Sequence, residues 1–228
     1  MNKKKILVVA SHPDDEIIGC GGTLLKYRKN KYDIKIVFTF LGNDLRKSSK
    51  SMLKVENDRR INDSIKVTRR LGISEPIFLN HLIINNNDRN FKSELNKNIL
   101  KLIKTHEPEI IFTHSYKDIH KDHRDTFEAV HIATRPQNKL KYLKKILMFE
   151  IPSATENYFL NKRFSPNHWV NIDREIKSKI SLLKIYKKEM LEYPNSRSLK
   201  AIENLCKFRG NQISIRYAEA FEVLRSID

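Results

Sequence analysis

The chain has few cysteines, no long apolar run and a deficit of acidic side chains. Its two cysteines, Cys20 and Cys206, are too few for a disulfide framework in 228 residues, so we expect a reduced, cytoplasmic protein. No run approaches the roughly 18 apolar residues of a membrane span. The basic start is followed by five apolar residues, Ile6 to Ala10, whereas a secretory signal needs about 7–15. We therefore expect neither a membrane span nor a signal peptide.

The acidic deficit leaves a formal net charge of +17, from 44 Lys and Arg against 27 Asp and Glu. Such a charge occurs in proteins that bind nucleic acid, anionic membranes or phosphorylated substrates. Here the basic residues are spread along the chain and interrupted by acids, as in Lys187-Lys188-Glu189. We interpret the excess mainly as compositional drift and expect no nucleic-acid partner. Attraction of an anionic small-molecule or lipid substrate is the second interpretation, and nucleic-acid binding the third.

Apolar runs of strand length alternate with amphipathic stretches of helix length. The expected strands are residues 5–11, 33–40, 76–80, 109–113 and 145–151, and the expected helices are residues 16–30, 51–71, 91–106 and 123–135. This alternation predicts an α/β fold, a Rossmann-like and mostly parallel sheet with helices on both faces.

One domain over residues 1–228 is the simplest organisation, because the sequence has no internal repeat and no low-complexity linker. Residues 1–150 would form the α/β core, and residues 151–228 a C-terminal cap that contributes to the substrate pocket. Within the cap we expect a loop at 152–167, a helix at 173–190 with Asp173 as its N-cap, and a helix at 197–208 stopped by Gly210.

An acidic turn, Ser11-His12-Pro13-Asp14-Asp15-Glu16, follows the first expected strand, where open α/β sheets place their ligands. Its carboxylates repel one another unless a cation is present. His12 and Asp15 could bind one divalent ion while Asp14 stays free as a base, and the imidazole favours Zn²⁺ over Mg²⁺. Capping of the following helix would explain one acidic residue, but not a histidine and three carboxylates together. A Mg²⁺ phospho-acceptor pocket is the other alternative.

A second cluster, His114 to His123, follows the strand at 109–113. A catalytic zinc site uses three protein ligands and water, so the first cluster needs one more ligand, and we choose His123. His120 could face the substrate oxygen, and Asp122 could orient a histidine by accepting its second N–H. We interpret His114 and His131 as structural.

The two motifs together resemble the PIG-L / LmbE-like family of zinc-dependent N-acetylglucosamine-type deacetylases. The family's first motif, Ala/Ser-His-Pro-Asp-Asp-Glu, matches residues 11–16, and its second, His-x-Asp-His, matches residues 120–123. The GCGGT segment at 19–23 and the layout after residue 145 are also similar, so the resemblance covers nearly the whole chain. Many members carry a Glu where Asn62 and Asp63 precede Leu71-Gly72 here.

The resemblance implies His12, Asp15 and His123 as ligands of one Zn²⁺ per chain, with Fe²⁺ or Co²⁺ as alternatives. It implies Asp14 as the general base and His120 as a group that stabilises or protonates the transition state. The implied reaction removes the acetyl group from an N-acetylated amino sugar that is linked to a nucleotide, a lipid or another group, including phosphorylated and lipid-linked sugars.

Several other side chains are candidates for contacts with the substrate. Arg197 and Arg209 could bind a phosphate, and Glu150 could contact sugar hydroxyls; each could equally be structural. Trp169 and Tyr158 could stack on a sugar or pack in the core. A metal-dependent amidase acting on a non-sugar or thiol conjugate is the alternative function, and a basic nucleic-acid-binding protein a distant third. The sequence leaves open the oligomeric state, a homo-oligomer included, and whether the loop at 152–167 is a lid.

Overall fold

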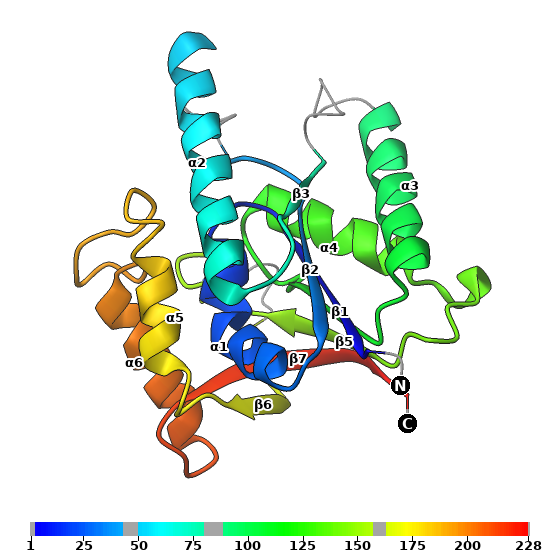
Figure 1. The fold of residues 1–228 in the computed structure, drawn as a ribbon. Coiled ribbons are helices and arrows are strands. Elements are labelled where there is room, and N and C mark those ends of the chain that lie inside the picture. Colours follow the sequence, from blue (N-terminus) through cyan, green and yellow to red (C-terminus); the bar gives the residue numbers. More distant parts are fainter. Residues whose placement is uncertain (1–2, 43–49, 80–88, 157–162, 228) are drawn as a thin grey trace.

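The computed structural model describes residues 3–42, 50–79, 89–156 and 163–227. Its described strands form one sheet in the order β3-β2-β1-β4-β5-β7-β6 (Figure 1). The strands are β1 (Lys5–Ala10), β2 (Asp33–Phe38), β3 (Ile77–Phe78), β4 (Ile110–His114), β5 (Lys145–Phe149), β6 (His168–Asn171) and β7 (Ala218–Ser226). The first five strands run parallel to one another, and β7 is antiparallel to both β5 and β6. The predicted mostly parallel α/β fold is therefore confirmed.

Helices cover both faces of the sheet. They are α1 (Asp15–Lys29), α2 (Lys50–Leu71), α3 (Arg89–His106), α4 (Lys121–Ala133), α5 (Ile176–Leu183) and α6 (Leu199–Asn211), with a short 3₁₀ turn at Pro136–Asn138. Helices α3 and α4 lie on one face, and α1, α5 and α6 on the other (Figure 1). None of the helices in the described ranges is long and apolar enough to cross a membrane.

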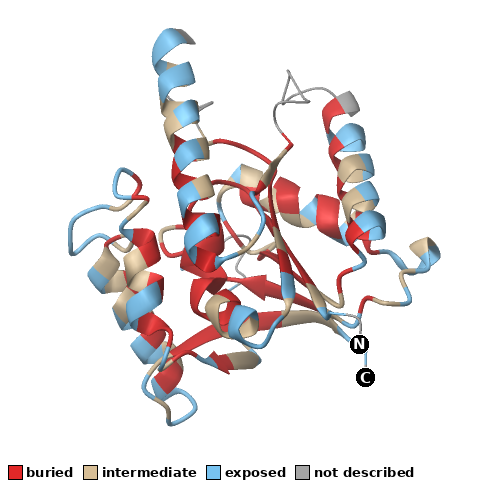
Figure 2. Cartoon of the chain, viewed as in Figure 1, coloured by how far each residue is buried: buried red, intermediate tan, exposed pale blue. Residues whose placement is uncertain are grey.

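Strand β1 packs against helices on both faces of the sheet. Its residues alternate between two cores: Ile6 and Val8 pack with the α1 side, and Leu7 and Val9 pack with α3 and α4. All four are fully buried. Figure 2 shows that buried residues make up most of the central strands. A strand covered on both faces is apolar at every position, which is why the run from 6 to 10 has no polar residue.

The C-terminal region differs from the prediction in its helices. The expected helix at 173–190 is the shorter α5, and Asp173 does not cap it; Asp173 Oδ1 instead accepts a hydrogen bond from the backbone N–H of Tyr217 at 2.7 Å. Gly210 does not stop the last helix but lies inside α6. A Cβ atom at Gly210 would come within 2.6 Å of the carbonyl oxygen of Ile215, so glycine allows the following turn to fold back closely.

The two strands β6 and β7 were not predicted. They belong to the same sheet as the N-terminal strands, next to β5. The division of the chain into a core and a cap stays a prediction.

Candidate metal centre

The two sequence motifs meet at one edge of the sheet. β1 and β4 are parallel neighbours, so the segments after Ala10 and after His114 leave the sheet at the same edge. The backbone N–H of Ser11 donates a 2.8 Å hydrogen bond to Nε2 of His114, which joins the two strand ends directly. Carboxyl ends of parallel strands are where α/β sheets place their ligands.

The acidic turn is held by its own side chains. Asp14 has φ 125°, a left-handed conformation that costs about 1–3 kcal/mol for a residue with a side chain. Its backbone N–H donates to Glu16 Oε2 at 2.9 Å, and the N–H of His12 donates to Asp15 Oδ2 at 2.9 Å. Glu16 in turn accepts a 2.7 Å hydrogen bond from the Tyr186 hydroxyl. The motif therefore supplies both the site's side chains and the hydrogen bonds that shape its backbone.

Three buried side chains converge on one point. Asp15 Oδ2 lies 3.2 Å from His12 Nδ1 and 3.4 Å from His123 Nε2, and the two ring nitrogens are 3.3 Å apart. One ligand atom from each residue fits within a group no wider than 4.8 Å. The structure thus brings together the three residues that the sequence singled out as metal ligands.

The other ring nitrogen of each histidine faces an aspartate. His12 Nε2 lies 3.0 Å from Asp122 Oδ2, and His123 Nδ1 lies 2.8 Å from Asp118 Oδ2. Carboxylates in this position fix the tautomer and orientation of ligating histidines. The sequence predicted that Asp122 orients a histidine but did not indicate which one, and it did not single out Asp118. The only indication of Asp118 in the sequence is its position in the same polar segment, between His114 and His123.

Two overlapping groups could also hold an ion: His12 with His120 and Asp122, and His114 with Asp118 and His123. The group of His12, Asp15 and His123 is the better candidate, because Asp118 and Asp122 already accept from the outward ring nitrogens. His114 stacks on His123 with the ring centroids 4.0 Å apart and is itself fully buried.

The electrostatics of the cluster suit a cation. Burial lowers the pKa of His123, but the charge of Asp15 and the hydrogen bond to Asp118 raise it overall to about 10. Burial raises the pKa of Asp15, but His123 and His12 bring it well below its ordinary value. Asp15 Oδ1 is buried without a hydrogen-bond partner. A divalent ion bound through Oδ2 would take over the charge that protonated histidine otherwise supplies, and coordination by both carboxylate oxygens would also give Oδ1 a partner.

Asp14 lies beside the cluster, buried and in contact with Arg197. Burial raises the pKa of Asp14 and the Arg197 guanidinium lowers it, which leaves it at about 7. Asp14, His12, His120, His123 and Arg197 share a pocket of about 250 Å³. The pocket is completed by Gly42, Arg60, Lys188, Glu189 and Leu191.

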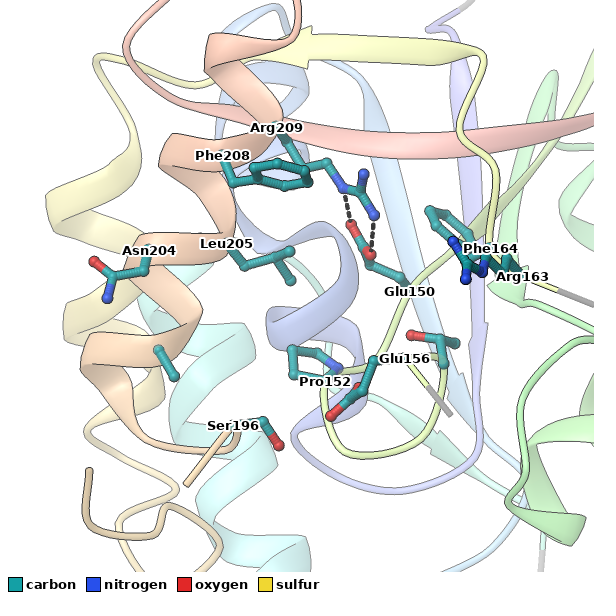
Figure 3. Close-up of a pocket in the computed structure, with 12 residues that line it drawn as sticks. Glu150, Pro152, Glu156, Arg163, Phe164, Ser196, Asn204, Leu205, Phe208 and Arg209 are labelled. Carbon is teal, nitrogen blue, oxygen red and sulfur yellow. Dashed lines mark hydrogen bonds and ion pairs between the residues drawn. The ribbon is translucent and has the colours of Figure 1, made fainter. Parts of the chain in front are cut away.

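Glu150 and Arg209 lie elsewhere. The Arg209 guanidinium donates two hydrogen bonds to the Glu150 carboxylate, at 2.7 and 2.6 Å, in a second pocket (Figure 3). Of the three charged residues proposed for substrate contact, Arg197 lines the metal pocket and these two do not.

The remaining candidates have varied surroundings. The indole N–H of Trp169 on β6 donates to the side-chain oxygen of Gln212 at 3.4 Å. His131 is exposed and stacks on Phe127 with centroids 5.6 Å apart, away from the cluster. Tyr158 lies outside the described residues.

Comparison with known proteins agrees with the motifs. Residues 7–134, more than half of the chain, match the family described as PIG-L: GlcNAc-PI de-N-acetylase. The chain belongs to the PIG-L family.

One relative resembles about a third of this chain. The 1D-myo-inositol 2-acetamido-2-deoxy-alpha-D-glucopyranoside deacetylase of Mycobacterium avium is 30% identical over 82 residues, which span 33% of this chain and 27% of the relative. The chain thus covers about a quarter of that relative's length.

Solved structures share the fold over the whole chain. The N,N'-diacetylchitobiose deacetylase of Pyrococcus horikoshii is 21% identical, with a TM-score of 0.72 over 98% of this chain and 85% of its own. The 4-carboxy-2-hydroxymuconate hydratase of Pseudomonas putida is 17% identical, with a TM-score of 0.77 over 99% of this chain and 98% of its own. Since a deacetylase and a hydratase share this fold, the activity has to be argued from the site.

Proposed function

We propose that this chain is a metal-dependent hydrolase that removes the acetyl group from an N-acetylated amino sugar. The observation that carries the proposal is the position of Asp14, a buried carboxylate that lines the same pocket as His12 and His123, the two histidines of the donor cluster. A base beside a three-ligand metal site is the arrangement that amide hydrolysis by activated water requires.

We further propose one Zn²⁺ per chain at the donor cluster, with Fe²⁺ and Co²⁺ as alternatives. Two imidazoles and one carboxylate form a ligand set that suits Zn²⁺ and leaves a position for water. The ion would lower the pKa of that water and polarise the acetamide carbonyl.

The chain's own residues would move the protons. Asp14, with a pKa of about 7, is poised to take a proton from water near neutral pH. Nδ1 of His120 accepts a 3.3 Å hydrogen bond from the N–H of Asp122, so the ring carries its proton on Nε2. His120 lines the pocket, and that Nε2–H can donate to the oxygen on which negative charge develops.

The reaction would break the amide C–N bond and release acetate and a free amine. Asp14 or His120 would return a proton to the leaving nitrogen. An N-acetylated amino sugar as substrate is supported by membership of the family and by the deacetylase activity in the names of the Mycobacterium avium and Pyrococcus horikoshii proteins.

A substrate panel tests the proposal. Acetate release would be measured with N-acetylated sugars, nucleotide-linked and lipid-linked sugars, and amide conjugates of thiols and other non-sugar amines. We expect release from at least one N-acetylated sugar. Turnover restricted to non-sugar or non-acetyl amides would favour the amidase alternative and overturn the deacetylase, while leaving the metal site intact.

Asp14→Asn tests the role of the base. We expect acetate release to fall at least about 100-fold, because general-base catalysis contributes roughly 10²–10⁴-fold. Metal content, measured by mass spectrometry, should stay at the wild-type value, because Asp14 is not among the proposed ligands. Asp125→Asn, a buried aspartate of α4 outside the pocket, is the control and should keep its rate. An undiminished rate for Asp14→Asn would remove Asp14 from this role.

A further inference from the structure

The segment that follows α5 contacts the acidic turn from the C-terminal part of the chain. Tyr186 in this segment is fully buried, and its hydroxyl donates a 2.7 Å hydrogen bond to Oε1 of Glu16. Tyr186 lies outside residues 7–134, which match the PIG-L family, and it is not among the residues that line the metal pocket. Any effect of Tyr186 on that pocket must therefore pass through Glu16.

Glu16 connects Tyr186 to Asp14, the proposed general base. Its second carboxylate oxygen, Oε2, accepts a 2.9 Å hydrogen bond from the backbone N–H of Asp14. The Glu16 side chain is fully buried, so its carboxylate is held by the groups packed around it rather than by bulk water. Because one oxygen meets the hydroxyl and the other meets the N–H, the hydroxyl of Tyr186 helps to set the orientation in which the carboxylate meets Asp14.

The backbone of Asp14 requires such a support. Its φ of 125° is a conformation that a residue with a side chain rarely adopts. Strained conformations persist only where the surrounding structure holds them, and they are concentrated at catalytic sites. Here Glu16 holds the backbone N–H of Asp14, and the Arg197 guanidinium donates to the Asp14 carboxylate. Both the backbone and the side chain of the base are therefore fixed by hydrogen bonds.

We propose that Tyr186 is a positioning residue for Asp14: by orienting Glu16, it holds the backbone conformation that places the Asp14 carboxylate in the metal pocket. The role of Asp14 as the base rests on the proposed function. A general base has to lie within about 2.6–3.2 Å of the group that it deprotonates, and a displacement of about 1 Å can cost on the order of 10²-fold in rate. The hydroxyl of Tyr186 would thus affect catalysis without touching the substrate or the metal.

Tyr186→Phe tests this inference, because it removes the hydroxyl and keeps the ring that packs in the core. Rates would be measured on Zn²⁺-loaded protein with the substrate of the panel that releases acetate fastest. We expect kcat to fall about tenfold, a part of the roughly 10²–10⁴-fold that general-base catalysis contributes. KM should stay within about twofold and the metal content at the wild-type value, because Tyr186 belongs to neither the pocket lining nor the donor cluster.

Two further variants separate positioning from a general structural role. Tyr217→Phe is the matched control: the Tyr217 hydroxyl also donates to a glutamate, Glu203 of α6, at 3.1 Å, and its loss should leave kcat unchanged. Adding Tyr186→Phe to Asp14→Asn should not lower the residual rate further, because the base through which Tyr186 acts is already lost. A tenfold loss that persists in the Asp14→Asn protein would overturn the inference.

Amide hydrogen exchange separates this inference from the proposed function. Tyr186→Phe should speed exchange of the Asp14 N–H at least about tenfold relative to the amides of β1, whose exchange reports global unfolding. If it does, and the wild type releases acetate from no substrate, the support of Asp14 by Tyr186 stands and the proposed function falls. If the wild type is active and Tyr186→Phe leaves kcat undiminished, the inference falls and the function stands. An unchanged exchange rate at Asp14 overturns the inference whatever the activity.

Discussion

Two aspartates of one polar segment hold different histidines of the donor cluster. Asp122 faces Nε2 of His12 and Asp118 faces Nδ1 of His123. The pattern of residues 120–123 drew attention to Asp122, which lies in the motif. Asp118 lies outside it, and only the turn before α4 brings its carboxylate back to His123.

Asp118→Asn should lower the affinity for Zn²⁺ about 10- to 100-fold, because a carboxylate that receives the outer N–H raises the basicity of the ligating ring. Competition with a chromophoric chelator would measure this. Asp125→Asn is the control, since Asp125 is also buried but pairs with Lys121 rather than with a histidine. Equal affinities for Asp118→Asn and wild type would show that Asp118 does not support the ligand.

Helix α1 is broken at Cys20, where φ is −143° and the backbone is not helical. The break leaves backbone N–H and C=O groups of α1 without partners inside the helix, and side chains of the C-terminal region form hydrogen bonds with them. Glu219 of β7 accepts hydrogen bonds from the N–H groups of Gly22 and Thr23 at 2.8 and 2.6 Å. Lys179 of α5 donates to the carbonyl of Ile18 at 2.8 Å and to Glu219 at 2.6 Å. This buried pair therefore holds the first half of α1, which carries Asp15.

Lys179→Met should lower the free energy of unfolding by about 3–5 kcal/mol, because it leaves the buried Glu219 carboxylate without its counterion. Urea denaturation followed by circular dichroism measures the change. Lys26→Met is the control: Lys26 Nζ donates to the carbonyl of Asn171 in an exposed contact, and its loss should cost under about 1 kcal/mol. Similar values for the two variants would contradict a structural role for the buried pair.

At the scale of the whole molecule, the donor cluster joins segments that are more than 100 residues apart. His12 and Asp15 follow β1, and His123 belongs to α4. An ion bound by all three would bind the folded chain and not the unfolded one, so its binding free energy adds to stability.

Metal removal should therefore lower Tm. At a free Zn²⁺ concentration 100 times Kd, binding contributes about 2.7 kcal/mol, which corresponds to roughly 5–10 °C in a chain of this size. Scanning calorimetry with a chelator, and again after Zn²⁺ is restored, would measure the shift. A His12→Ala/His123→Ala variant should show no dependence on Zn²⁺. A Tm that is the same with and without the ion in the wild type would argue against this centre.

The local pattern of residues was enough to predict the parallel strands, the helices between them and the two motifs at their ends. Buried strands are apolar throughout and helices repeat every 3.6 residues, so both can be recognised within a short window. β6 and β7 escaped prediction because β6 has four residues and β7 carries buried Glu219 and Glu222, which interrupt its apolar pattern.

Only the tertiary structure determined which charged side chains form ion pairs with one another. The sequence marked Glu150, Arg197 and Arg209 as candidates to contact one substrate, but it could not pair them. In the fold, Arg197 lies on Asp14 at the metal pocket, and Arg209 joins Glu150 in the pocket beside it. Such pairs join residues 59 and 183 positions apart, and their partners are set by packing of the helices on the sheet rather than by any local pattern.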